Sequence, residues 1–240
     1  MKTILVTGVS KGLGLVLITS LLEDGHMVYG ISRSENLELN ILKQKYKSSF
    51  VHLQYDLSLT DSVLDLSNYI LANKIKFNSF INNAAHAYDD IITNANFDKL
   101  EYMFKTNVLN PIMIVKTMLR NYILNKTKGT IVHISSISVH TGYKGLSMYA
   151  STKGAIESFS KNTAREWGEM GIRSNCIVAG FMETDMSSNL TNEQKQRIYN
   201  RTSLKKETDK NSVVDTIKFL ISDNSKSITG QNLFVDSGTI

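Results

Sequence analysis

A short apolar run that leads through a glycine-rich turn into a helical pattern is the feature that most restricts the fold. Residues 2–7 (KTILVT) are apolar and β-branched, which is typical of a strand buried on both faces. The turn TGVSKGLG then places Gly8, Gly12 and Gly14 before the helical pattern LVLITSLLEDG. This order brings backbone close to a pyrophosphate at a helix N-terminus. Because the spacing is GxxxGxG rather than GxGxxG, a plain tight turn stays open as an alternative.

Strand-like and helical patterns then alternate along the chain. Further strands are expected at residues 27–33, 50–55, 79–82, 130–135, 173–178 and 232–235, and helices at 60–72, 97–125, 149–169, 192–199 and 213–222. This alternation predicts an α/β fold, a single-domain Rossmann-type doubly wound parallel sheet of about seven strands with helices on both faces, over residues 1–240. The ends of the first, fourth and fifth strands then share one edge, where a dinucleotide binds.

Three local features carry their own expectations. Thr60 or Asp61 is expected to cap the helix at 60–72. Pro111, the one proline of the chain, should kink its helix or lie next to a bend. The polar segment 182–211 is expected to form a lid over the cofactor, with a solvated surface helix as the alternative.

Composition restricts the functional class. The chain has 240 residues, 42% of them hydrophobic, which is enough for a full core in one domain. Its formal charge of +5 comes from scattered basic residues, and the sequence has neither zinc-ligand spacing nor an aromatic RNA-binding motif, so we expect no nucleic acid partner and no metal. Apolar runs stay shorter than a membrane span. Cys176 is the only cysteine, and we predict a cytoplasmic protein in a reducing compartment.

Tyr149 and Lys153 form the strongest candidate catalytic pair. A step of four residues places both side chains on one face of a helix, one turn apart. A neighbouring ammonium favours the phenolate, so the pKa of Tyr149 is expected to fall toward the working range of a general acid or base. Ser136, thirteen residues before Tyr149, is expected to end a strand and hold the oxygen of a carbonyl or alcohol. An ordinary tyrosine–lysine pair on an exposed helix is the alternative.

The end of the second expected strand bears on cofactor choice. NAD-selective sites place an acidic residue there, whereas this chain has Ser32 and Arg33, with Lys11 in the glycine turn. An arginine fork matches a phosphate bidentately, so these residues favour NADP(H). The alternative is that Arg33 is a solvated loop charge.

These motifs together resemble the short-chain dehydrogenase/reductase family over essentially the whole chain. They are TGxxxGxG at 7–14, an NNAG-like turn at 82–85, Asn107, Ser136, YxxxK at 149–153, and SITGQ near the C-terminus. Within the family the chain is most similar to the 3-oxoacyl-[acyl-carrier-protein] reductases, notably in the stretches AREWGEMGI, AGFMETDM and SITGQNLFVDSG.

The resemblance implies a catalytic tetrad of Asn107, Ser136, Tyr149 and Lys153. Tyr149 would protonate a carbonyl that receives hydride, and Ser136 would hold its oxygen. Lys153 would lower the pKa of the tyrosine and bind the nicotinamide ribose, while Asn107 would anchor a water that resupplies the proton. The implied NADP(H) site consists of Gly8, Ser10, Lys11, Gly12, Leu13, Gly14, Ser32, Arg33, Asp56, Leu57, Asn83, Ala84, Tyr149, Lys153, Met182 and Thr184.

The chain also departs from the family pattern. Ala85 replaces a usual glycine and Ala179 a usual proline. Thr127 and Met170 stand where the acyl-carrier reductases have arginines that meet the carrier protein, and nearby cations, Lys126, Lys128 and Arg173, are candidate substitutes.

The leading hypothesis is an NADPH-dependent ketoreductase acting on a 3-oxoacyl thioester carried by acyl carrier protein or coenzyme A. A reductase or dehydrogenase of a keto sugar or another small polar ketone is the second hypothesis, because two carrier-binding arginines are replaced. A non-catalytic protein that senses NADP(H) is the third. From the resemblance we also expect a homotetramer or homodimer.

Overall fold

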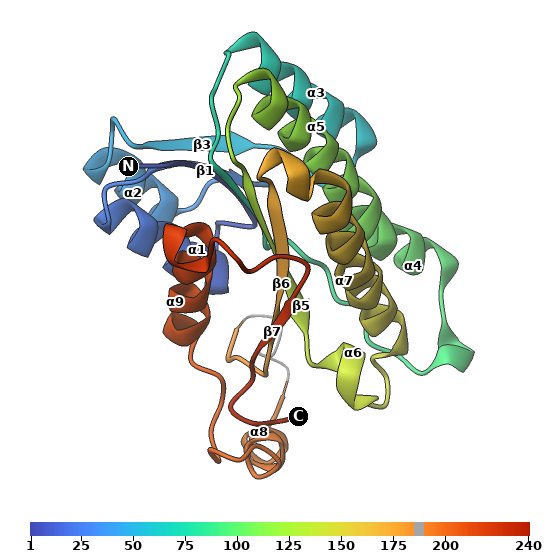
Figure 1. Cartoon of the computed structure of the whole chain (residues 1–240). Coiled ribbons are helices and arrows are strands. Elements are labelled where there is room, and N and C mark those ends of the chain that lie inside the picture. Colours follow the sequence, from blue (N-terminus) through green and yellow to red (C-terminus); the bar gives the residue numbers. More distant parts are fainter. Residues whose placement is uncertain (185–189) are drawn as a thin grey trace.

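The structure is a computed structural model that describes residues 1–184 and 190–240 (Figure 1). Its centre is a seven-stranded sheet in the order β3-β2-β1-β4-β5-β6-β7, in which every neighbouring pair of strands is parallel. The strands are β1 (Thr3–Thr7), β2 (Met27–Ser32), β3 (Phe50–Gln54), β4 (Ser79–Asn82), β5 (Thr130–Ser136), β6 (Arg173–Ala179) and β7 (Asn232–Val235). The predicted doubly wound α/β fold is confirmed, and the predicted strands agree with the structure to within one residue at each end.

Helices connect the strands and cover both faces of the sheet (Figure 1). They are α1 (Gly12–Glu23), α2 (Leu37–Lys45), α3 (Thr60–Ala72), α4 (Phe97–Phe104), α5 (Asn110–Leu124), α6 (Ser138–Thr141), α7 (Ser147–Trp167), α8 (Asn192–Tyr199) and α9 (Lys210–Ile221). Among the residues described, none of these helices combines the length and the apolar character that crossing a membrane requires.

The core has two layers, one on each face of the sheet. Ile4 and Val6 of β1 pack with α1, α2 and α9, whereas Leu5 between them packs with α3 and α5 on the opposite face. This alternation follows from the two-residue period of a strand. Burying each such side chain contributes about 2 kcal/mol. The core therefore explains why the strands read as continuous apolar runs, and it leaves the strand ends as the place for polar chemistry.

Two local expectations are corrected. The N-cap of α3 is Leu59, without a side-chain cap, because Asp56 instead accepts hydrogen bonds from the backbone and hydroxyl of Ser58. The helix expected at 97–125 is interrupted by a π-helical turn over Lys105–Leu109, directly before the first turn of α5, where Pro111 lies. Proline has no N–H to donate to the carbonyl four residues earlier, which is that of Asn107. The chain widens to a π turn at this point.

Candidate active site

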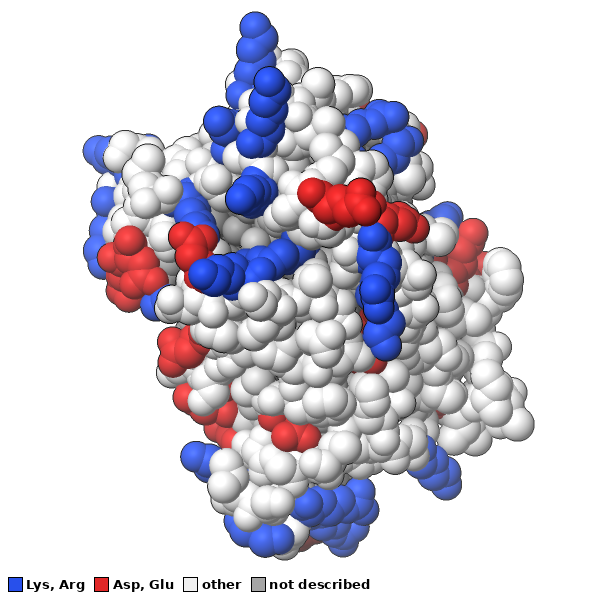
Figure 2. Space-filling view, in the orientation of Figure 1, with Lys and Arg blue, Asp and Glu red and all other residues white. Residues whose placement is uncertain are grey.

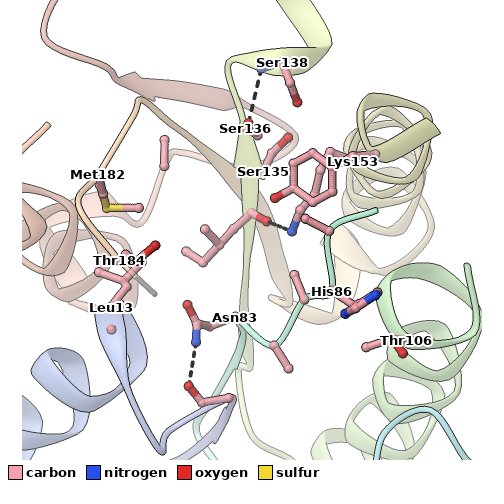
Figure 3. Close-up of a pocket in the computed structure, with 18 of the residues that line it drawn as sticks. Leu13, Asn83, His86, Thr106, Ser135, Ser136, Ser138, Lys153, Met182 and Thr184 are labelled. Atoms are coloured by element: carbon pink, nitrogen blue, oxygen red, sulfur yellow. Dashed lines mark hydrogen bonds between the residues drawn. The ribbon is translucent and has the colours of Figure 1, made fainter. Parts of the chain in front are cut away.

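A cavity of about 700 Å³ lies at the carboxyl edge of the sheet. The loops after β1, β2, β3, β4, β5 and β6 line it, together with the start of α7. Figure 3 shows Leu13, Met182 and Thr184 on one side of this space, with Ser136 and Lys153 on the other. Every residue predicted from the sequence to bind the cofactor lies in the wall of this cavity, and so do three of the four predicted catalytic residues. The fourth, Asn107, is buried behind the wall.

Lys153 is the buried cation of the site. It extends from α7, is only 5% exposed, and donates from Nζ to the backbone oxygen of Ile134 in β5 at 2.8 Å (Figure 3). Its Nζ lies 5.6 Å from the centre of the Tyr149 ring. Burial lowers the pKa of Lys153 to about 8, because an ammonium loses hydration inside the protein. Lys153 therefore lies beside Tyr149 as predicted, and the loss of hydration of its ammonium disfavours the charged form.

The pKa of Tyr149 differs from the sequence expectation. Burial of the phenol raises it above its ordinary value, and the negative charge of Asp89 raises it further. The predicted downward shift is therefore wrong for the protein without cofactor, because burial of the phenol and the charge of Asp89 both act in the upward direction. The consequence is a phenol that holds its proton at neutral pH, the state required of a general acid.

Ser136 is the last residue of β5 and faces the cavity. The backbone N–H of Ser138 donates to its Oγ at 3.2 Å (Figure 3). Because this contact uses the oxygen as an acceptor, the hydroxyl proton stays available for a ligand oxygen. The neighbouring Ser135 also borders the cavity, but its hydroxyl donates to the buried carboxylate of Glu157.

Asn107 occupies the middle of the π turn and is 2% exposed. Its Oδ1 accepts the backbone N–H of His86 at 2.8 Å, and its Nδ2 donates to the backbone oxygen of His86 at 2.8 Å and to Thr152 Oγ1 at 3.0 Å. Both amide protons are therefore used inside the protein. The side chain of Asn107 therefore joins the loop after β4 to α7.

The glycine turn packs against the turn after β4. Gly8 has φ +73°, and an added Cβ would lie 2.8 Å from the Cα of Ala84. A Cβ on Gly14 would lie 2.0 Å from the backbone oxygen of Gly8. Asn83 completes the contact, since its Nδ2 donates to the oxygens of Thr7 and Gly8 at 3.0 Å each. Gly8 and Gly14 are therefore needed for close packing, which a plain tight turn would not require, whereas Gly12 is favoured by its φ of +56°.

Helix α1 begins directly behind this turn. In the described part of the chain it has no side-chain cap, and its first residues, Gly12, Leu13 and Gly14, line the cavity. A helix N-terminus of this kind, next to closely approaching glycine backbone, fits a pyrophosphate.

The end of β2 carries the cation predicted to select a 2′-phosphate. Arg33 lines the cavity, and its Nη1 donates to the hydroxyl of Tyr102 in α4 at 3.0 Å. Ser32 is used internally, since its hydroxyl contacts the oxygen of Ser34 and His52 Nε2. The next acidic residue, Glu35, pairs with Lys43 and lies near His52. The carboxylate closest in sequence to Arg33 is thus already engaged.

The predicted lid falls partly outside the described residues, which leave out 185–189. In the described part, α8 begins with a capping box at Thr191, and Leu190, Ile198 and Arg201 line the cavity. Glu183 accepts a hydrogen bond from Tyr199 and pairs with Lys195, so α8 is tied to the strand-end segment.

Sequence analysis did not single out four residues that shape the site: His86, Asp89, Tyr102 and Thr152. Thr152 had a visible signal, because it is a hydroxyl residue directly before Lys153. The others act across contacts between distant segments, which a single sequence does not reveal.

The comparisons with known proteins agree with this geometry. The family described as enoyl-(acyl carrier protein) reductase matches residues 8–239. The chain is 29% identical to L-xylulose reductase of Caenorhabditis elegans, over 99% of this chain and 95% of that protein. It is 30% identical to the 3-oxoacyl-[acyl-carrier-protein] reductase FabG of Buchnera aphidicola subsp. Schizaphis graminum, over 99% and 96%.

The protein belongs to the short-chain dehydrogenase/reductase family. It is accordingly an oxidoreductase. Among solved structures, ElxO with NADP bound superimposes with a TM-score of 0.89 at 26% identity, covering 100% of this chain and 99% of that one. A 4-hydroxyisoleucine dehydrogenase complexed with NADH gives a TM-score of 0.94 at 24% identity, covering 100% and 98%, and this likeness shows the fold alone.

The residues at which this short-chain dehydrogenase/reductase departs from its family pattern differ in backbone conformation and exposure. Ala85 is not among the residues with positive φ, so no glycine is needed there. Ala179 ends β6, and its carbonyl accepts the N–H of Ile137. Thr127 is only partly exposed, whereas Met170 is 49% exposed.

The candidate carrier-binding cations behave differently from one another. Arg173 is excluded as a substitute, because its guanidinium donates to Thr130 Oγ1 and to the backbone oxygens of Leu220, Ser222 and Ile228. Lys126 and Lys128 are exposed. Figure 2 shows basic side chains projecting from the end of the molecule where α3 and α5 end in Figure 1. Other basic side chains gather at the opposite end, where α8 lies, and both signs of charge occur between the two ends.

The buried ammonium predicts a pH-dependent gain in stability for Lys153→Met. With a pKa lowered from 10.5 to about 8, the unfolded state binds more protons between these values, so the stability contributed by Lys153 rises with pH across this window. Below pH 8 the buried Lys153 is charged, and the full free-energy cost of burying its ammonium applies. We expect Lys153→Met to raise the free energy of unfolding by roughly 3 kcal/mol at pH 7, and the gain to vanish near pH 10.5. Denaturant unfolding of both proteins at each pH measures this, and an equal gain at both values contradicts it.

Proposed function

We propose that this protein is an NADPH-dependent ketoreductase. One observation supports this most: the protonated phenol of Tyr149, the hydroxyl of Ser136 and the buried ammonium of Lys153 line one cavity together with the glycine turn and Arg33. A carbonyl group needs a proton donor and a hydrogen bond to its oxygen when hydride reaches its carbon. These residues supply both.

NADP(H) is the proposed cofactor. The glycine turn and the N-terminus of α1 would hold its pyrophosphate, and Arg33 and Lys11 would meet its 2′-phosphate. Solved relatives differ in what they hold, NADP in ElxO and NADH in the 4-hydroxyisoleucine dehydrogenase. Arg33 and the engaged Glu35 favour NADP(H) for this chain. When bound, the cofactor supplies the hydride.

The protein residues would bind the carbonyl oxygen and deliver the proton. Ser136 donates its free proton as a hydrogen bond to the carbonyl oxygen and fixes its position. Tyr149 transfers its proton to the same oxygen, which completes the alcohol once the carbonyl carbon has received hydride. The Lys153 ammonium stabilises the phenolate left behind, because a positive charge beside the ring opposes the cost of burying a negative one. Asn107 holds its backbone carbonyl near α7 as an acceptor for the water that returns the proton.

Replacing the phenol tests this assignment. In Tyr149→Phe we expect NADPH oxidation with a ketone substrate, followed at 340 nm, to fall at least about 100-fold, because the proton donor is lost. NADPH affinity, measured by fluorescence titration, should stay within a few-fold. Tyr143→Phe, which removes another phenol from the same cavity wall, serves as the matched control and should keep its kcat. Normal turnover in Tyr149→Phe would contradict the proposed mechanism.

Arg33 should decide the choice between the two cofactors. In Arg33→Ala we expect the Kd for NADPH to rise about 10- to 100-fold, because a charge-assisted contact with the 2′-phosphate is lost. The Kd for NADH should change by less than about threefold, since that cofactor has no such phosphate. Arg165→Ala, an exposed arginine on α7, is the control. An equal loss of affinity for NADPH and NADH would show that Arg33 does not bind the 2′-phosphate.

Two substrate classes remain as candidates. A 3-oxoacyl thioester is the first, supported by the relationship to FabG and by the exposed Lys126 and Lys128 beside Thr127. A keto sugar or another small polar ketone is the second, supported by the relationship to L-xylulose reductase and by the internal role of Arg173.

Parallel assays separate these candidates. With NADPH, we expect acetoacetyl-CoA to be turned over with a kcat/KM at least about tenfold above that for L-xylulose, because the thioester is the leading assignment. The reverse ranking would move the assignment to polar ketones. If the protein binds NADPH tightly and turns over neither, nor a reactive diketone such as diacetyl, a cofactor-sensing protein becomes the better interpretation.

A further inference from the structure

We propose that Thr152 is a positioning residue that holds Asn107 in register with the start of α7, and thereby with Tyr149 and Lys153. This inference rests on the proposed function, because it assigns the purpose of the contact to proton transfer at that site. It concerns a side chain that lies outside the four catalytic residues and outside the cavity wall formed by the described residues.

The hydrogen bonds around Thr152 run in one direction. Its Oγ1 donates to the backbone oxygen of Tyr149 at 2.8 Å, three residues earlier in α7. A threonine hydroxyl has a single proton, so toward Asn107 the same oxygen must accept, and Asn107 Nδ2 donates to it at 3.0 Å. Asn107, Thr152 and Tyr149 thus form a continuous chain of donors and acceptors.

This chain connects two separate segments. Asn107 belongs to the π turn between α4 and α5, whereas Thr152 and Tyr149 belong to α7. Among the described residues, the one other hydrogen-bond partner of the Asn107 side chain is the backbone of His86. Without the hydroxyl of Thr152, nothing among the described hydrogen bonds would tie the amide of Asn107 to the helix that carries the proposed acid.

The environment makes the hydroxyl necessary. Thr152 is 0% exposed and Asn107 is 2% exposed, so water does not replace a lost contact. An amide proton left without a partner in such a place is strongly disfavoured, and the amide would rotate to seek another acceptor. Its rotation would also break the two hydrogen bonds to the backbone of His86, and with them the tie between the loop after β4 and the π turn.

Two variants separate the hydroxyl from the packing. Thr152→Val keeps the branched shape and removes the hydroxyl, whereas Thr152→Ser keeps the hydroxyl and removes a methyl group. Thr163→Val is the matched control on the same helix, because Thr163 is 2% exposed and its hydroxyl donates to the backbone oxygen of Phe159, four residues earlier in α7 itself.

The first measurement is steady-state reduction with NADPH and acetoacetyl-CoA, L-xylulose or diacetyl, whichever the wild type turns over fastest. We expect Thr152→Val to lower kcat about 10-fold with KM values within about twofold, because positioning acts on the proton-transfer step. The solvent deuterium isotope effect on kcat should increase. Thr152→Ser and Thr163→Val should keep at least about half of the wild-type kcat.

The second measurement needs no substrate. Backbone hydrogen exchange at His86, whose N–H donates to Asn107 Oδ1, should become about tenfold faster in Thr152→Val and stay unchanged in Thr152→Ser and Thr163→Val. If the wild type reduces no ketone, the proposed function fails, and exchange still decides whether Thr152 holds Asn107. Unchanged exchange in Thr152→Val overturns the inference, and so does a Thr152→Ser variant as impaired as Thr152→Val.

Discussion

The hydrogen bonds between the ends of β1 and β4 are the constraint on which the site depends. Thr7 Oγ1 accepts the backbone N–H groups of Asn83 and Ala84 at 3.1 and 3.0 Å, and Asn83 Nδ2 donates back to the oxygens of Thr7 and Gly8. Parallel strands pair along their length, but their ends diverge into loops unless something holds them together. Here both loops stay in contact, so the glycine turn and the turn after β4 form one continuous wall. This wall lines the cavity at the carboxyl edge of the sheet.

The site is arranged at a cost to the fold. Lys153 places an ammonium where it is 5% exposed, and Tyr149 loses hydration of its phenol. A backbone oxygen of β5 compensates only part of the cost of burying the charge. The sheet tolerates this because apolar cores on both of its faces supply stability that is independent of the site. Such separation between a stable framework and a strained edge is common where a few polar groups must be held without water.

Much of the fold was predictable because its signals are local. The two-residue period of the strands and the glycine turn are properties of short segments, and they placed the sheet and the site edge correctly. Helix α2 was missed because only Leu39 and Leu42 are buried in a mostly polar segment capped by Asn36. Its amphipathic signal is too weak to recognise from sequence alone.

The errors at the site have a different physical origin. The pKa of Tyr149 depends on burial and on Asp89, sixty residues earlier in the chain, and neither effect follows from the spacing to Lys153. Arg173 looked like a surface cation, but four internal oxygens hold it. The pKa of a side chain depends on contacts between distant segments, whereas sequence spacing reports only on neighbours along one helix or strand.

The π turn before Pro111 has a consequence for how the sequence of this chain can change. A π turn equals one residue inserted into an α-helix, and a residue advances a helix by about 100°. Removing that residue would rotate α5 relative to α4 and carry Val115 and Met118 off the core, so a gain or loss of one codon here cannot be neutral.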